Sequence, residues 1–380
     1  MLSAGETSGD LHGGTLCRAL RDLEPELGLV GMGGPRMAAA GMEVVADPIA
    51  HAVVGTSEAV GRLPALYRAY RALVRRLREA PPRALVVIDF PEFNMRLARQ
   101  ARRAGVPVIY FIPPQVWAWR RGRVRLIARL ASRVLAVFPF EPALYQAAGV
   151  AVDFVGHPIL DVLPEGLDRG GARAVLGVAG DQPLVGLFPG SRREEIARLL
   201  PAMLDAARRL AASSGGGAPR FLLGLAPSVE HSVVDGLIAE GRAAGGPPVE
   251  IVAQRTYEVM AAADAILIAS GTATLEAALL GAPMVVCYRV SRFTEVISRL
   301  LIRIPWISLP NIVAGRAVVP ELLQDDATGE RLAAEARRLL SEPGVAAAQR
   351  AAFADLRSRL GEPGVGRRAA RAVLAAARAA

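Results

Sequence analysis

Short runs of apolar, often β-branched residues alternate along this chain of 380 residues with longer segments of helical periodicity. Buried strands that alternate with helices form parallel sheets covered by helices on both faces. Strands are expected at 27–31, 84–89, 106–111, 134–138 and 152–155, and again at 184–188, 221–225, 250–252, 265–268 and 283–288. The sequence therefore predicts an α/β protein with two Rossmann-like, doubly wound domains in series and a helical C-terminal segment.

A proline- and glycine-containing segment at 163–166 has the composition of a linker between the two halves. We expect a first domain at 1–162, a second domain at 167–345, and C-terminal helices at 346–380 that pack back toward the first domain. In open α/β sheets, ligands bind beyond the carboxyl ends of the strands. Functional residues are therefore expected in the loops that directly follow strands.

The composition excludes several classes of protein. Hydrophobic residues make up 52% of the chain and charged residues 21%, which excludes a disordered protein. No apolar run reaches about 18 residues and no signal peptide is visible, so a cytoplasmic protein without a spanning helix is expected. Cys17 and Cys287 are far apart and the four histidines are scattered, which predicts no disulfide, no metal site and no cofactor.

All 45 basic residues are arginine, and the net charge is +9. The lack of lysine excludes Schiff-base catalysis and a lysine-containing phosphate loop. Arginine binds phosphate, carboxylate, anionic membranes and nucleic acid, and a bias in codon usage explains the composition equally well. No motif typical of nucleic-acid binding is present, so no nucleic-acid partner is expected.

Two loops of the second half have the composition of anion-binding turns. One follows the expected strand at 184–188 and opens a helix, whose first amides can bind phosphate. The other follows the strand at 265–268 and combines small and hydroxyl residues with a carboxylate that suits a ribose diol. Ordinary turns and helix caps are the alternative for both loops. Together they predict a nucleoside diphosphate site formed by Gly190, Ser191, Arg192, Ser270, Gly271, Thr272, Thr274 and Glu276.

Polar and aromatic residues also follow strands in the first half. Glu6, Ser8 and Asp10 lie where a first strand would meet its helix, and are expected to line a sugar pocket or to begin a capped helix. Asp89 ends a strand and is either a general base or a helix cap. Trp117 either stacks on a sugar or packs in the core.

These motifs occur together in an order that resembles the lipid-A-disaccharide synthase family over nearly the whole chain. The departure is at the start, where only four residues precede Gly5 in place of a full strand. The segments that carry the resemblance are 4–10, 34–37, 88–94, 115–120, 190–192, 270–276 and 308–316.

The resemblance implies an inverting glycosyltransferase with the GT-B fold. It would transfer 2,3-diacylglucosamine from its UDP donor to the 6-hydroxyl of 2,3-diacylglucosamine 1-phosphate, which forms the lipid A disaccharide precursor. By position, Asp89 resembles the family's general base, Arg192 its donor-phosphate arginine and Glu276 its ribose-binding carboxylate. Glu6, which is expected to be catalytic together with Asp89, and Asn311 match cleft positions of the family, and a homodimer is left open.

A nucleotide-sugar epimerase and a non-catalytic nucleotide- or lipid-binding protein are the competing interpretations. An epimerase would keep the UDP loops and would need acid–base groups on both faces of the sugar. A binding protein would form no product. The apolar surface of the first half and the segment around Trp117 favour a lipid substrate.

Residues 63–78 have the pattern of an amphipathic helix. Leu66, Tyr70, Leu73, Val74 and Leu77 share one face, and the arginines lie largely off it. Such a helix either binds a membrane surface or packs in the core with a solvated arginine face. Because the implied substrates carry acyl chains, we expect peripheral attachment to the inner face of the inner membrane through these five side chains.

Overall fold

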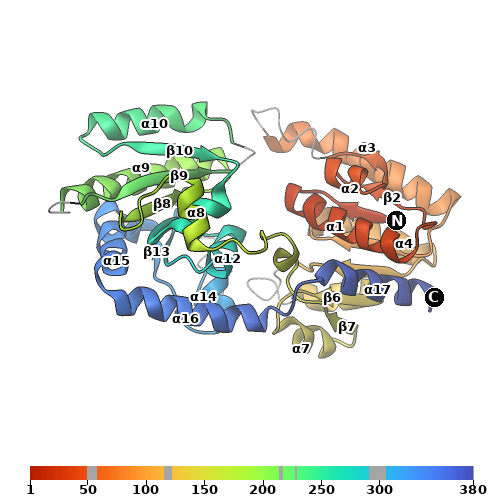
Figure 1. Cartoon of the computed structure of the whole chain (residues 1–380). Helices are drawn as coiled ribbons and strands as arrows, with labels where there is room; N and C mark the ends of the chain where they lie inside the picture. The colour runs from red at the N-terminus through yellow and green to blue at the C-terminus, as the bar shows by residue number, and fades with distance from the viewer. Residues whose placement is uncertain (49–57, 115–121, 214–216, 227–228, 291–304, 380) are drawn as a thin grey trace. The chain divides into compact units, whose positions relative to one another are not determined.

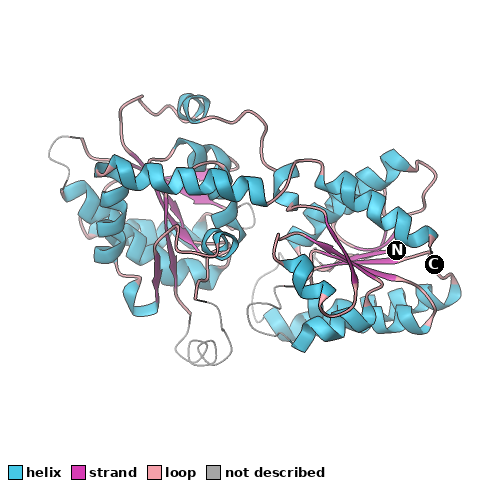
Figure 2. Cartoon of the chain, turned by 90° about the horizontal axis from the view of Figure 1, so that it is seen from below, coloured by secondary structure: helices cyan, strands magenta, loops and turns pink. Residues whose placement is uncertain are grey.

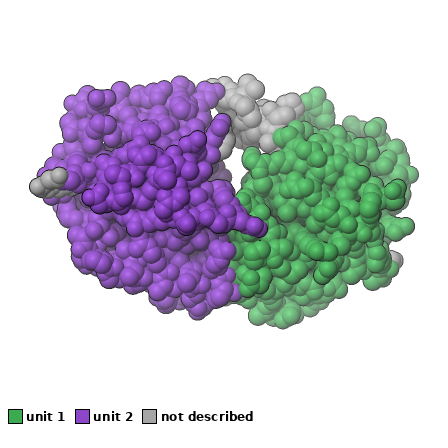
Figure 3. All heavy atoms as spheres, viewed as in Figure 1, with its two compact units in different colours: residues 1–162, 360–380 green, residues 163–359 purple. Residues whose placement is uncertain are grey.

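The structure is a computed structural model that describes residues 1–48, 58–114, 122–213, 217–226, 229–290 and 305–379. The chain folds into two compact units (Figure 3). Unit 1 comprises residues 1–162 and 360–380, and unit 2 comprises residues 163–359. Trp117 lies outside the described residues.

Unit 1 contains a parallel sheet of seven strands in the order β3-β2-β1-β4-β5-β6-β7 (Figure 1). Because the order reverses between β1 and β4, the connections on either side of this pair run in opposite directions along the sheet. The strands are β1 (Leu2–Ala4), β2 (Val30–Met32), β3 (Glu43–Ala46), β4 (Leu85–Ile88), β5 (Val108–Phe111), β6 (Arg133–Ala136) and β7 (Ala151–Phe154).

Helices cover both faces of this sheet (Figure 2). One face packs against α3, α4 and α6 in a continuous apolar core, and α1 and α17 lie side by side elsewhere in the unit. The helices of unit 1 are α1 (Thr7–Leu23), α2 (Pro35–Ala39), α3 (Glu58–Glu79), α4 (Pro91–Arg103), α6 (Gly122–Leu130), α7 (Glu141–Gln146), the 3-10 helix η2 (Pro158–Asp161) and α17 (Val365–Arg378).

Unit 2 repeats the same plan with six parallel strands in the order β10-β9-β8-β11-β12-β13. The order here reverses between β8 and β11. The strands are β8 (Leu184–Phe188), β9 (Arg220–Leu225), β10 (Val249–Ala253), β11 (Ala265–Ala269), β12 (Met284–Tyr288) and β13 (Glu321–Leu323).

Two apolar clusters cover the two faces of the second sheet. One is formed with α9, α10 and α15, and the other with α8, α11, α12 and α16. The helices of unit 2 are α8 (Arg169–Val175), α9 (Arg193–Ala212), α10 (Ser232–Ala243), α11 (Thr256–Ala262), α12 (Thr272–Leu279), α14 (Leu309–Ala314), the 3-10 helix η3 (Gln324–Asp326), α15 (Gly329–Ser341) and α16 (Pro343–Arg359).

The predicted fold class is confirmed: both halves are doubly wound and the chain ends in helices. All ten expected strands are present, with ends shifted by at most a few residues. The first strand implied before Gly5 is also present as β1, and two further short strands, β3 and β13, were not predicted. β3 lies at the edge of its sheet with alternate residues exposed, so it lacks the continuous apolar run that marks a buried strand.

The chain crosses between the units twice. α16 belongs to unit 2, whereas α17 completes unit 1. The side chain of Asp161 in η2 accepts hydrogen bonds from the backbone amides of Gly364, Val365 and Gly366 at 2.6–3.1 Å, which fixes the start of α17. The C-terminal segment thus divides at residue 360 between the two units.

The predicted membrane face of α3 is wrong. Leu73 and Leu77 are fully buried, and Leu66, Tyr70 and Val74 pack against the same core as the strands of unit 1. This face instead packs in the core, as the alternative interpretation of a core helix with solvated arginines had it. Periodicity alone did not decide between the two because a core face and a lipid face have the same spacing of apolar residues.

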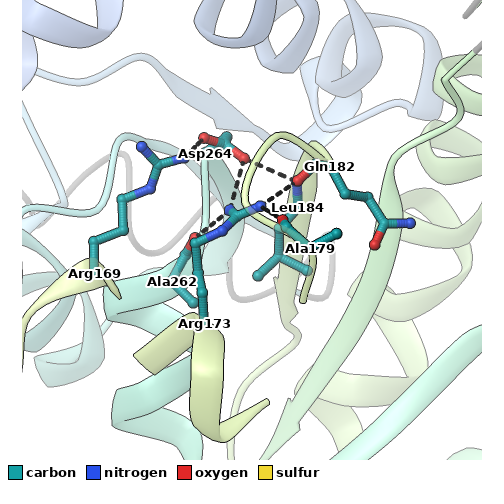
Figure 4. A network of polar contacts seen from close by, with 7 residues as sticks. All are labelled: Arg169, Arg173, Ala179, Gln182, Leu184, Ala262 and Asp264. Atoms are coloured by element: carbon teal, nitrogen blue, oxygen red, sulfur yellow. Dashed lines mark hydrogen bonds and ion pairs between the residues drawn. The ribbon is translucent and has the colours of Figure 1, made fainter. Parts of the chain in front are cut away.

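A buried arginine anchors the first helix of unit 2 at the amino end of its sheet (Figure 4). Arg173 in α8 is 6% exposed and donates to the carbonyls of Ala262, Ala179 and Gln182. It also contacts Asp264, which accepts from the amide of Leu184 at 2.9 Å. A second arginine, Arg169, contacts the same carboxylate. These bonds offset the cost of burying a guanidinium and tie α8 to β8 and β11.

Candidate active site

The four loops that the sequence singled out follow the four strands that flank the two reversals of strand order. The loop at Gly5 follows β1 and Asp89 follows β4 in unit 1, while Gly190 follows β8 and Ser270 follows β11 in unit 2. At such a reversal the flanking helices diverge, and the carboxyl ends of the two central strands are left open to a ligand.

Asp89 and Phe90 leave β4 in the left-handed region of backbone space, with φ values of 45° and 46°. Two consecutive non-glycine residues in this region carry strain of roughly 1–3 kcal/mol each, a feature concentrated at functional sites. The turn packs the Phe90 ring onto Gly5, where an added Cβ would lie 2.1 Å from the ring. The loop after β1 therefore needs a glycine at position 5, because the Phe90 ring of the loop after β4 fills the space that a side chain would take.

Burial, and to a lesser extent the nearby carboxylate of Glu6, raise the pKa of Asp89 from 3.8 to about 6. Glu6 and Ser8 are exposed at the start of α1. A carboxyl group with a pKa near the working pH, at the open end of a central strand, is suited to accept a proton from a hydroxyl.

The prediction that Asp10 lines a sugar pocket is wrong. Its side chain is 2% exposed and accepts from the amides of Gly34, Arg36 and Met37 at 2.8–3.1 Å. These are the first amides of α2, which are otherwise without partners in a helix. Asp10 is thus a cap that joins α1 to α2, and the sequence did not show it because the capped helix lies more than twenty residues away.

In unit 2 the turn after β8 presents an exposed arginine. Gly190 has φ 113°, and an added Cβ would lie 2.7 Å from the carboxylate of Glu195. Arg192 is the residue before α9 and its guanidinium lies 3.2 Å from Glu195, with most of its surface open to solvent. Ser191 is also exposed. The first amides of α9 and Arg192 together form a positively polarised surface.

The loop after β11 divides its residues between holding the loop and facing solvent. Ser270 donates to the carbonyl of Ile307 at 3.0 Å, and Thr274 donates to the carbonyl of Gly271 at 2.8 Å. Ser270 and Thr274 therefore use their hydroxyl hydrogens within the loop. Gly271 and Thr272 are the residues of this loop that are exposed to a ligand.

Glu276, one turn into α12, accepts from the hydroxyl of Tyr257 at 3.3 Å. Burial raises the pKa of Glu276, and the bond from Tyr257 lowers it. Tyr257 was not singled out from the sequence, because nothing in the sequence shows that α11 lies beside α12.

The prediction that Asn311 lies in a cleft is wrong. Asn311 is 1% exposed, and its amide bonds to the backbone of Val318 and Val319 and to the carboxylate of Glu321. Glu321 in turn accepts from the amides of Ile307 and Ser308 and from the Ser308 hydroxyl. This network holds α14 and the start of β13, and it leaves no donor or acceptor of Asn311 for a substrate.

The net charge is distributed unequally. Arginines and carboxylates balance in unit 2, so the whole of the +9 is carried by unit 1. Within the described ranges, no group of histidine, cysteine and acidic side chains is arranged to hold a metal ion. The helices of the same ranges are all too short or too polar to cross a bilayer.

The fold is shared with several solved proteins, one of them crystallised with a nucleotide sugar. UDP-N-acetylglucosamine 2-epimerase of Neisseria meningitidis, solved with bound UDP-GlcNAc, gives a TM-score of 0.65 at 13% identity and covers 96% of this chain and 97% of that one. The calicheamicin glycosyltransferase gives a TM-score of 0.58 at 16% identity, and the match covers 99% of this chain and 96% of that one. MurG of Acinetobacter baumannii gives a TM-score of 0.60 at 14% identity, and the match covers 98% of both chains. The architecture is thus that of the GT-B glycosyltransferases.

Sequence similarity identifies the family within this class. The model of the family described as lipid-A-disaccharide synthetase matches residues 1–375, and the chain belongs to this family. The lipid-A-disaccharide synthases of Geobacter metallireducens and Myxococcus xanthus are 48% and 42% identical over 374 residues, which are 98% of this chain and 96% of each relative. The protein is therefore a glycosyltransferase that forms the lipid A disaccharide.

We predict that Asp89→Asn stabilises the protein at neutral pH. Folding raises the pKa of this carboxyl to about 6, so the folded state holds the proton more tightly than the unfolded chain. Stability therefore falls as the pH rises from about 4 to about 6, and the loss persists at higher pH. Urea denaturation should show a gain of roughly 1–3 kcal/mol for the variant at pH 7.5 and little change at pH 4.

The control is Asp22→Asn, on the exposed side of α1, which should change stability little at either pH. An equal effect of Asp89→Asn at both pH values would show that the carboxylate is not costly to bury.

Proposed function

We propose that Asp89 of unit 1 is the general base of the transfer reaction and that the two loops of unit 2 bind the UDP part of the donor. The observation that carries this proposal is the Asp89 carboxyl, which is held in a strained turn at the open end of β4 with a pKa of about 6. The donor is UDP-2,3-diacylglucosamine, and the acceptor is the 6-hydroxyl of 2,3-diacylglucosamine 1-phosphate.

In this proposal each residue of the two unit 2 loops has one task. Arg192 and the first amides of α9 bind the diphosphate, because both present hydrogen-bond donors to an anion. Gly271 and Thr272 bring a backbone amide and a hydroxyl to the same anion. Glu276 accepts from the ribose hydroxyls, and Ser270 and Thr274 keep the loop in shape.

The chemistry is a single displacement at the anomeric carbon. The acceptor oxygen forms its bond to this carbon as the bond to the UDP oxygen breaks, and the configuration inverts. The acceptor proton passes to the Asp89 carboxylate, and the charge that develops on the leaving diphosphate is stabilised by Arg192 and the amides of α9. Glu6 is exposed near Asp89 and helps to hold the pKa of this base high, which favours proton uptake.

We further propose peripheral attachment of unit 1 to the inner face of the inner membrane. The outward face of α3 exposes Leu63 and Tyr67, each with 62% of its surface accessible, and the Arg71 guanidinium lies 6.0 Å from the Tyr67 ring centre. Exposed arginines continue along the helix at Arg75 and Arg78. Apolar side chains beside arginines, on the unit that carries the whole net charge, fit an anionic lipid surface.

Product analysis tests the reaction. Incubation with UDP-2,3-diacylglucosamine should yield disaccharide and UDP only when the monosaccharide acceptor is present. We predict that Asp89→Asn lowers kcat by about 100-fold or more, the range for a lost general base, with the donor KM nearly unchanged. An epimerised nucleotide sugar formed without acceptor would refute the transferase, and activity within a few-fold of wild type would refute the base.

The donor site has its own test. Arg192→Ala removes a charge-assisted phosphate contact and Glu276→Ala removes a ribose acceptor, so each should weaken UDP binding by about 1.5–3 kcal/mol in calorimetry. Arg193→Ala is the matched control, since this exposed arginine follows Arg192 directly and is assigned no contact. Unchanged UDP affinity in both site variants would place the donor elsewhere.

The membrane proposal predicts that Leu63→Ser with Tyr67→Ser leaves the protein folded and weakens its binding to anionic vesicles. Binding of the wild type should also fall with added salt, because each arginine near the surface contributes about 1 kcal/mol. Val175→Ser, at an exposed apolar site of unit 2, is the control. Undiminished vesicle binding by the double variant would exclude this face of α3.

A further inference from the structure

Asn94 is fully buried beneath the turn that carries Asp89. It lies in the first turn of α4, which Pro91 begins, and helical side chains at such positions point back toward the start of the helix. This direction places the carboxamide under the carboxyl ends of β1 and β4. A buried amide of this kind must satisfy both donors and its acceptor within the protein.

The carboxamide bonds to the ends of both central strands. Its nitrogen donates to the carbonyls of Asp89 at 2.8 Å, Ile88 at 3.1 Å and Ser3 at 3.2 Å. Its oxygen accepts from the hydroxyl of Ser3, itself buried, at 2.6 Å. One side chain thus joins β1, β4 and the catalytic turn.

A second donor reaches the same carbonyl from the neighbouring strand. The Tyr110 hydroxyl in β5 lies 3.2 Å from the carbonyl oxygen of Asp89, and Tyr110 is 2% exposed. Burial raises the pKa of Tyr110 well above its ordinary value, so the hydroxyl stays protonated and donates throughout the working range. The carbonyl of Asp89 therefore accepts from two buried side chains.

These bonds act against the strain of the turn. Continuing β4 in an extended conformation would leave the Asp89 carbonyl opposite Pro113, which follows β5 and has no N–H to donate. The last bond of the ladder, from the Asp89 amide to the Phe111 carbonyl, is already long at 3.4 Å. The left-handed turn at residues 89 and 90 instead directs the carbonyl inward, where it would lack a partner without Asn94 and Tyr110. A strained conformation persists only where surrounding bonds determine it.

We propose that Asn94 and Tyr110 are positioning residues, which hold the left-handed turn and so present the Asp89 carboxylate to the acceptor hydroxyl. This inference rests on the role proposed for Asp89. Neither side chain touches a substrate. Without them the chain would relax toward the extended conformation, the carboxylate would turn toward water, and it would lose both its placement and its raised basicity.

The experiment uses Asn94→Leu and Tyr110→Phe in the full chain. Tyr110→Phe removes one oxygen from a packed ring and keeps the core, so it remains informative if Asn94→Leu does not fold. We expect kcat to fall by about 10-fold for Tyr110→Phe and more for Asn94→Leu, with the donor KM within about two-fold of wild type. The acid limb of the kcat/KM profile should move to lower pH, because a carboxylate that turns toward water loses the burial that raises its pKa.

The matched control is Gln349→Leu. Gln349 is also a buried amide that bonds to backbone, at the amide and carbonyl of Met284 in unit 2. Its loss should lower stability and leave kcat and the pH profile of the folded protein unchanged. The same result for Asn94→Leu and Tyr110→Phe would reduce both residues to structural ones and overturn the inference.

A mutant cycle separates this inference from the role of Asp89. In an Asp89→Asn background, Tyr110→Phe should cause no further loss of kcat, because the residues act through the same carboxylate. A further loss of full size would overturn the positioning role. Retained activity in Asp89→Asn alone would instead refute the general base, whatever the other variants show.

Discussion

The pairing of β1 with β4 is the constraint on which unit 1 depends. Because the chain winds outward in opposite directions from this pair, α1 and α4 diverge and the two carboxyl ends stay open. The loops after β1 and β4 must then pass close to one another, which restricts the residue at position 5 and strains the backbone at residue 90. Gly5 has no side chain because the Phe90 ring occupies the space, and Phe90 reaches it only through a left-handed backbone.

The same open ends explain a conflict between stability and function. Two strained residues, a desolvated carboxyl and a neighbouring carboxylate all meet at the end of β4. Each feature destabilises the folded state, and each is offset by groups that do no chemistry, such as the buried amide of Asn94. Such residues stabilise the fold around the site, so that the strained and desolvated groups needed for the reaction can be kept.

Sequence patterns predicted elements whose signal is local. The buried strands of both sheets appear as apolar runs, and the loops at Asp89 and Arg192 were found because ligand sites follow strands. Asp10 and Asn311 were misjudged because their partners, the amides of α2 and the carboxylate of Glu321, are distant along the chain. For Leu73 and Leu77 the spacing was recognised correctly, but the surface they contact is the core of unit 1.

The return of α17 to unit 1 has a consequence for biosynthesis. α17 packs beside α1 and buries Ala369, Ala370 and Val373, yet it is translated only after the whole of unit 2. Until then the partner face of α1 is uncovered, so the first half of the chain cannot complete its core while unit 2 is being translated. Nascent chains of this architecture expose apolar surface until α17 has been translated, and the docking of this helix is the event that closes the N-terminal fold.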